Sequence, residues 1–104
     1  MSEHFLVERY WPGVDRDQLT SATSRLGTAA RELAAVGHAV RVLNSVFIAA
    51  DEVVLSLFEA ATEDDVVEVN RRSGVPFDRV QQVQVCSARP RRGIHADSAD
   101  FGTP

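Results

Sequence analysis

The order in which strand-like and helix-like patterns follow one another restricts the fold of this chain more than any other feature. Branched and aromatic residues fill positions 4–11, and Pro12-Gly13 then breaks regular structure. A long helical pattern, two strand-like runs, a short helical pattern and an alternating run follow. This order is the split βαβ arrangement. We therefore predict an α+β fold of ferredoxin-like type, a βαββαβ sandwich whose four-stranded antiparallel sheet carries both helices on one face.

Two segments carry the helical pattern together with its end signals. Asp15 and Gln18 form a capping pair before a helix predicted at residues 16–36, in which apolar residues recur three and four positions apart. A second helix is predicted at residues 63–73, because acidic residues open it and Gly74 closes it.

The other three strands are predicted at residues 39–48, 53–59 and 80–87. The first two of them are dense in Val, Leu and Phe and are joined by a short acidic loop, which is typical of a hairpin. In the last one, Val83 and Val85 alternate with polar residues, which indicates a half-buried strand.

Composition and charge limit the class of protein. A chain of 104 residues, 44% hydrophobic and 25% charged, is sized for one packed domain. We predict that domain over residues 1–88 and a flexible tail over residues 89–104, where Arg, Gly, Ser, Asp and Pro dominate. A net charge of -4 argues against nucleic-acid binding, and no apolar run could span a bilayer or serve as a secretory signal. We expect a cytoplasmic protein that binds neither nucleic acid nor membrane.

Alternation along the predicted strands sorts their side chains into two faces. The face expected under the helices is nearly all apolar: Phe5, Val7, Val40, Val42, Val46, Ile48, Val53, Leu55, Leu57, Val83 and Val85, with Arg9, Asn44 and Glu59 as exceptions. The opposite face is mixed: His4, Leu6, Glu8, Tyr10, Arg41, Leu43, Ser45, Phe47, Val54, Ser56, Phe58, Gln82, Gln84 and Cys86. Its large apolar groups are unusual for a face open to water. We expect a second copy of the chain to cover it, in a homodimer of the dimeric α+β barrel type.

The polar residues of the mixed face form the first candidate site. In such a homodimer Glu8, Tyr10, Arg41 and Ser56 would be enclosed beside apolar neighbours such as Phe58, and this setting suits a small-molecule ligand. The alternative is that these groups make interface hydrogen bonds only.

Asn70 is the polar residue on the inward stripe of the second predicted helix, after Val66 and Val69. A buried amide needs a hydrogen-bond partner. It either bonds to a cap or to the sheet, or it lines the ligand pocket with the residues above.

Signals for metal binding and catalysis are absent from the sequence pattern. His4, His38 and His95 fall in a strand start, a helix end and the tail, without the spacing of metal ligands. Cys86 has no Lys or His nearby in sequence that would activate it, and there is no glycine-rich phosphate loop or nucleophile elbow. We expect no metal and no cofactor.

Three stretches resemble a bacterial family of domains of unknown function that includes nickel-binding proteins. They are FLVERY at 5–10 with Pro12-Gly13, LFEA at 57–60 and VNRRSGVPFDRV at 69–80, and the resemblance covers residues 5–85. It implies a ferredoxin-like fold and a homodimer. Nickel-binding members have histidines near the positions held here by Asn70 and Val75, whereas this chain has none between His38 and His95.

These observations leave three functions open. The first is a small-molecule-binding homodimer without a recognisable catalytic motif. The second is a cofactor-free enzyme, such as a cyclase, an isomerase or a monooxygenase-like protein of a biosynthetic pathway, because related folds host such chemistry. The third is nickel binding, as in the family that the chain resembles.

Overall fold

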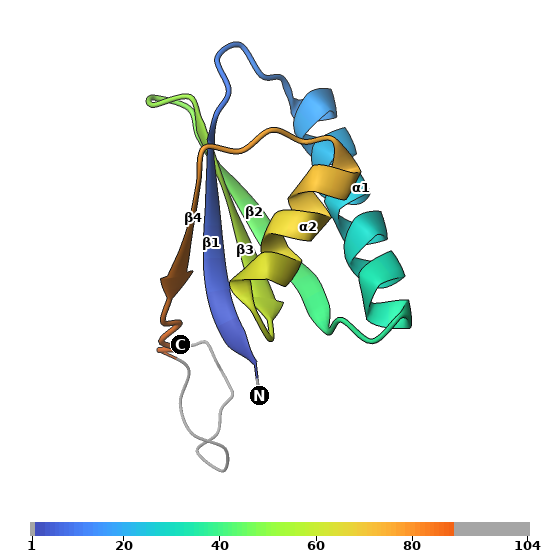
Figure 1. The fold of residues 1–104 in the computed structure, drawn as a ribbon. Coiled ribbons are helices and arrows are strands. Elements are labelled where there is room, and N and C mark those ends of the chain that lie inside the picture. The colour runs from blue at the N-terminus through green and yellow to red at the C-terminus, as the bar shows by residue number, and fades with distance from the viewer. Residues whose placement is uncertain (1, 89–104) are drawn as a thin grey trace, which may run out of the picture.

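The computed structural model describes residues 2–88 and shows the predicted order of elements. They are β1 (Glu3–Tyr10), α1 (Arg16–Ala35), β2 (Val40–Ile48), β3 (Val53–Ala60), α2 (Glu63–Ser73) and β4 (Arg79–Val83). The strands form one antiparallel sheet in the order β2-β3-β1-β4, and both helices cover the same face of it (Figure 1). The ferredoxin-like α+β prediction is confirmed.

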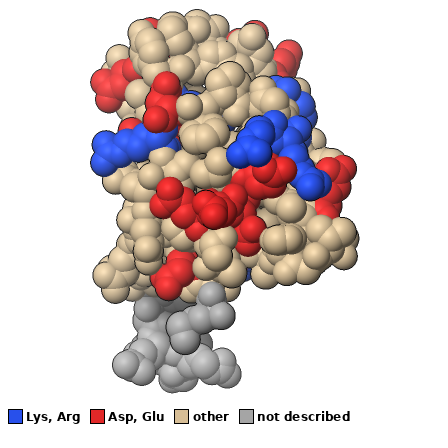
Figure 2. All heavy atoms as spheres, in the orientation of Figure 1, with Lys and Arg blue, Asp and Glu red and all other residues tan. Residues whose placement is uncertain are grey.

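The helix ends follow the sequence signals. The backbone N–H of Gln18 donates to Asp15 Oδ1 at 2.7 Å and the N–H of Asp15 donates to Gln18 Oε1 at 2.9 Å, which completes a capping box at α1. Gly74 ends α2 with a φ of 70°, a left-handed conformation that glycine adopts at little cost. Acidic side chains gather over the first half of α2 and basic ones beyond them, as the helix dipole favours (Figure 2).

The core lies between the helices and one sheet face. Phe58 and Val7 contribute fully buried side chains from the sheet, and Val66 and Val69 contribute them from α2. The buried stripe of α1 consists of Ala22, Leu26, Ala29, Ala30 and Leu33. Its alanines let α1 approach the sheet and α2 closely, so the two-layer sandwich follows from the apolar periodicity of the helices.

β4 is shorter than predicted, because it ends at Val83 and not at residue 87. Within residues 2–88 its partner strand is β1 alone, and Val83 pairs with His4, next to the first residue of β1. Beyond this point β4 would have no strand opposite to bond with, so alternation alone overestimated its length. The predicted tail over residues 89–104 lies outside the described residues.

The two faces of β3 are the reverse of the prediction. Phe58 pairs with Phe5 and Ser56 pairs with Val7, so these side chains point toward the helices, whereas Leu57 points away from them. β3 carries large apolar residues at adjacent positions, and alternation therefore did not decide which set faces inward. The prediction thus assigned each β3 side chain to the face opposite to the one that it occupies, as a shift of the alternation by one residue would.

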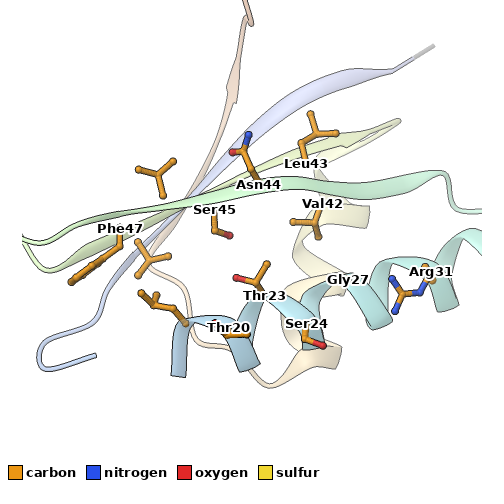
Figure 3. A pocket seen from close by; sticks show the side chains of 13 residues that line it. Thr20, Thr23, Ser24, Gly27, Arg31, Val42, Leu43, Asn44, Ser45 and Phe47 are labelled. Carbon is orange, nitrogen blue, oxygen red and sulfur yellow. The ribbon is translucent and has the colours of Figure 1, made fainter. Parts of the chain in front are cut away.

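β2 changes face at a β-bulge between Val42 and Asn44. Leu43 and Asn44 both point away from α1, and Ser45 and Phe47 therefore point toward it (Figure 3). Val46 and Ile48, which were predicted under the helices, lie on the opposite face. β4 is also reversed, since Val80 packs on the core and Val83 shares a face with His4.

Candidate ligand-binding site

The six predicted ligand residues do not form one site. Glu8, Tyr10 and Arg41 lie on the face without helices, as predicted, but Arg41 lies apart from Glu8 and Tyr10, which are neighbours on β1. Arg41 pairs with Glu59 across the strands, and its Nε donates to Glu59 Oε1 at 2.8 Å. Glu8 lies opposite Leu55, which is four positions before Glu59 in β3, and it accepts a hydrogen bond from Gln81 Nε2 at 3.1 Å. Within residues 2–88, Glu8 and Arg41 therefore have different partners and do not pair with each other.

Ser56 and Phe58 lie on the helix side of the sheet, which corrects their predicted placement. The hydroxyl of Ser56 hydrogen-bonds that of Ser45 across the strands at 2.8 Å. Phe58 is fully buried in the core. Neither side chain can line a pocket on the other face.

Asn70 serves the core through a hydrogen bond to the sheet, which is one of its two predicted roles. Its Oδ1 accepts from Arg9 Nη2 at 2.9 Å, and its Nδ2 donates to the Val66 carbonyl at 2.8 Å. Arg9 Nη1 also donates to the Pro76 carbonyl at 2.9 Å. Burial lowers the pKa of Arg9 to about 10, while the negative charge of Asp78 acts in the opposite direction. Arg9 therefore stays charged at neutral pH and fastens α2 and the following loop to β1.

The face without helices, called here the open sheet face, is more apolar than the sequence suggested. Its apolar residues are Leu6, Leu43, Val46, Ile48, Val53, Leu55, Leu57 and Val83. Val46 and Ile48 are 53% and 37% exposed. At one end His4, Glu59 and Arg41 form a polar row, in which the hydrogen bond from Arg41 lowers the pKa of Glu59.

A groove of about 580 Å³ lies between α1 and the free edge of β2 (Figure 3). Its lining is part apolar and part polar: Leu19, Thr20, Thr23, Ser24, Gly27, Arg31, Val42, Leu43, Asn44, Ser45, Val46, Phe47 and Val54. Thr23 and Ser45 extend toward each other from opposite walls, and Phe47 lies toward one end and Arg31 toward the other (Figure 3). We call this hollow the α1–β2 groove.

A second hollow of about 450 Å³ continues along the same edge. It shares Gly27, Arg31 and Val42 with the α1–β2 groove, so Arg31 stands where the two meet. β2 is an edge strand, and its outer backbone groups have no partner strand within residues 2–88. The groove therefore offers backbone hydrogen-bonding groups in addition to its side chains.

Reasoning from the sequence did not identify this groove. One signal was present, because Thr20, Thr23, Ser24, Gly27 and Arg31 recur at helical spacing and form a small, polar stripe beside the buried stripe of α1. The other wall depends on the bulge in β2, which turns Ser45 and Phe47 toward the helix. Without the bulge these side chains were placed on the wrong face.

Metal-ligating side chains do not converge in the described part of the chain. No group of three His, Cys, Asp or Glu residues there could hold a metal ion. His38 Nδ1 lies 3.0 Å from Asp65 Oδ1, and His4 lies beside Glu59 on the open sheet face. His95 lies outside the described residues. Within residues 2–88, no helix is both long enough and apolar enough to cross a membrane.

Comparison with known proteins supports the fold. No model of a known protein family matches the chain, and a search of curated proteins finds no match. Among solved structures, the chain is similar to the crystal structure of SCO4226 from Streptomyces coelicolor A3(2), with a TM-score of 0.69 at 20% sequence identity. The match covers 81% of this chain and 99% of the other. At this identity the similarity establishes a shared ferredoxin-like architecture.

Proposed function

We propose that this chain is a non-catalytic small-molecule-binding protein that acts as a homodimer. The observation that carries the binding proposal is the α1–β2 groove. Its volume of about 580 Å³ falls within the range of ligand sites. Apolar side chains of Leu19, Phe47 and Val54 share the lining with hydroxyl groups, which is the usual composition of a site that binds and orients an organic molecule.

The chemistry of the lining favours binding over catalysis. The described residues that line the α1–β2 groove include no Asp, Glu, His, Cys, Lys or Tyr. General acid–base and nucleophilic catalysis use these side chains, or a hydroxyl activated by one of them. The groove has hydroxyl groups, and one of them, that of Ser45, is bonded to another hydroxyl, that of Ser56.

Gly27 provides independent support for the groove. Glycine within a helix costs about 1 kcal/mol relative to alanine. A Cβ atom at Gly27 would meet only Nη1 of Arg31, at 3.5 Å, which is an ordinary contact. Close packing therefore does not require a glycine here. The missing side chain keeps the groove open beside Arg31 at a cost in helix stability.

The dimer proposal is based on the open sheet face. Val53, Leu55 and Leu57 are consecutive outward residues of the central strand β3, and Leu6 lies beside them on β1. An antiparallel sheet normally turns polar groups to water on its free face. A second copy is the simplest cover, because a two-fold axis places the same apolar patch on both sides of the interface.

The groove and the open sheet face meet at the bulge. Leu43, Asn44 and Val46 line the groove, and their side chains also lie on the open sheet face. A ligand at the groove would therefore contact the same strand that the partner copy covers. Binding and dimerisation are expected to influence each other.

The binding proposal is tested by screening a mixed library of small neutral and charged compounds against the full chain by NMR. We expect hits to shift backbone resonances of α1 and β2. Gly27→Leu fills the groove and should abolish these shifts, whereas Gly27→Ala serves as a control that raises helix propensity and fills less space. Hits that bind Gly27→Leu as well as the unmodified chain would refute the groove as the site.

A further inference from the structure

We propose that the ligand of the α1–β2 groove is a small organic anion with an apolar body, whose negative group binds Arg31. This inference rests on the binding function proposed above and names the class of ligand. It is carried by the charge of Arg31, by the apolar end of the groove and by the hydroxyl groups between them.

Arg31 is a cation without an acidic partner. Within residues 2–88, no carboxylate lies within 4.0 Å of its guanidinium, and its hydrogen bond is to Thr28 Oγ1 at 3.3 Å. Arg41, by contrast, is paired with Glu59, and Arg71 and Arg72 are paired with Glu68. The guanidinium at the groove thus keeps most of its donors available, in a planar arrangement that suits a carboxylate or a phosphate.

The rest of the lining does not oppose an anion. Among residues 2–88, none that lines the α1–β2 groove is acidic. Glu59 lines the adjoining hollow, but its carboxylate is already bonded to Arg41. Arg31 is therefore the only formal charge among the residues described as lining the α1–β2 groove, and it favours a negative ligand over a neutral or positive one.

The opposite end of the groove is suited to an apolar group. Phe47 points from β2 toward this end, and Leu19 and Val54 also line the groove. Between this end and Arg31 the walls carry the hydroxyl groups of Thr23 and Ser45 (Figure 3). A medium-length carboxylate would bury its chain against Phe47 and direct its head to Arg31, with room for polar substituents in the middle.

The test compares octanoate with octanol, which share an apolar chain and differ in charge. Each is titrated into the full chain and followed by NMR, with Arg31→Gln and Arg16→Gln as a matched pair of variants. Arg16 is exposed on the same helix and does not line the groove, so its variant has the same net charge as Arg31→Gln. Both variants change an exposed side chain and should melt like the unmodified protein.

We expect octanoate to bind the unmodified chain more tightly than octanol does. We expect Arg31→Gln to lower the affinity for octanoate by about fivefold, as for the loss of a partly exposed ion pair. Octanol binding should stay the same in every variant, and Arg16→Gln should bind octanoate like the unmodified chain. Equal binding of octanoate and octanol, or equal weakening by both variants, would overturn the anion inference while the binding function stands. If neither compound binds in the groove, the anion inference is refuted, whereas the groove function is decided separately by the library screen and the Gly27→Leu variant.

Discussion

The two faces of the sheet carry similar apolar side chains but have different surroundings. On the helix-covered face, Val7 and Phe58 are completely buried. On the open sheet face, Val46 is 53% exposed and its neighbours are only partly covered by one another. Leu57 and Phe58 are adjacent in β3 and point in opposite directions, so a single strand supplies both environments.

This difference supports our proposal that a second copy covers the open sheet face. Burial of apolar surface stabilises a protein by about 25 cal/mol per Å². The helices supply this burial on one side, and on the other side it needs another surface. The same strand composition that makes the inward face hard to predict thus supports the interface that we propose at the open sheet face.

The largest expected loss of stability comes from a substitution on the helix-covered face of the sheet. Phe58→Ala should lower the free energy of unfolding by about 3–5 kcal/mol, because it leaves a cavity among Phe5, Val42 and the helices. Urea unfolding followed by circular dichroism measures this loss. A loss below about 1 kcal/mol would show that Phe58 is not a core residue and that the assignment of the two faces is incorrect.

The matched substitution on the open sheet face should weaken dimer formation and leave the fold intact. Leu57→Asp places a charge in the middle of the proposed interface and should raise the dimer dissociation constant by about a hundredfold or more, while the far-ultraviolet spectrum is retained. Val36→Asp is the control, since Val36 is an exposed apolar residue at the end of α1, outside this face. Sedimentation equilibrium compares the two variants. Equal dissociation constants would be evidence against this face as the interface.

A smaller effect is expected at the polar contact within the covered face. Arg9→Met should cost about 1–3 kcal/mol of stability, because Asn70 Oδ1 and the Pro76 carbonyl lose their donors. Adding Asn70→Leu should recover part of the loss, since one of the unsatisfied acceptors is then removed. Strictly additive losses in a double-mutant cycle, measured by urea unfolding, would contradict this coupling.

The smallest expected effect is a pH dependence of the free energy of unfolding, which Glu59 causes at one end of the open sheet face. The hydrogen bond from Arg41 lowers the pKa of Glu59 below its usual 4.5 in the folded protein. The folded state therefore binds fewer protons at Glu59 than the unfolded state does. The resulting stabilisation is fully present above pH 4.5 and is lost as the pH falls through the lower folded-state value.

Arg41→Gln tests this dependence, because it removes the cause of the shift. Unfolding measured at neutral and acidic pH should show a smaller loss on acidification in Arg41→Gln than in the unmodified protein. An NMR titration of the Glu59 carboxyl should show its midpoint rise toward the usual value. An unchanged midpoint would mean that the hydrogen bond from Arg41 does not lower the pKa of Glu59 when the protein is in solution.

Much of the fold could be predicted from local patterns. The capping pair Asp15–Gln18, the end of α2 at Gly74 and the inward set Phe5, Val7 and Arg9 of β1 follow from short-range rules. The range of α2 also agrees with the prediction. These features depend on residues close in sequence, which is why single-chain reasoning reaches them.

The candidate site depends on features that local patterns do not encode. The bulge at Leu43 has no glycine to mark it, and it changes the face of every later residue of β2. β3 has apolar residues on both faces, so its orientation was decided by packing under α1 and α2. Ser56 and Phe58 were consequently assigned to the wrong face, and the groove between Thr23 and Ser45 was missed.

The most direct test of this account is the mass of the full chain in solution. Light scattering at micromolar concentration should give twice the chain mass of 11.4 kDa for the unmodified protein and the mass of a single chain for Leu57→Asp. A mass of 11.4 kDa for the unmodified protein at these concentrations would contradict the claim that its open sheet face is covered by a second copy.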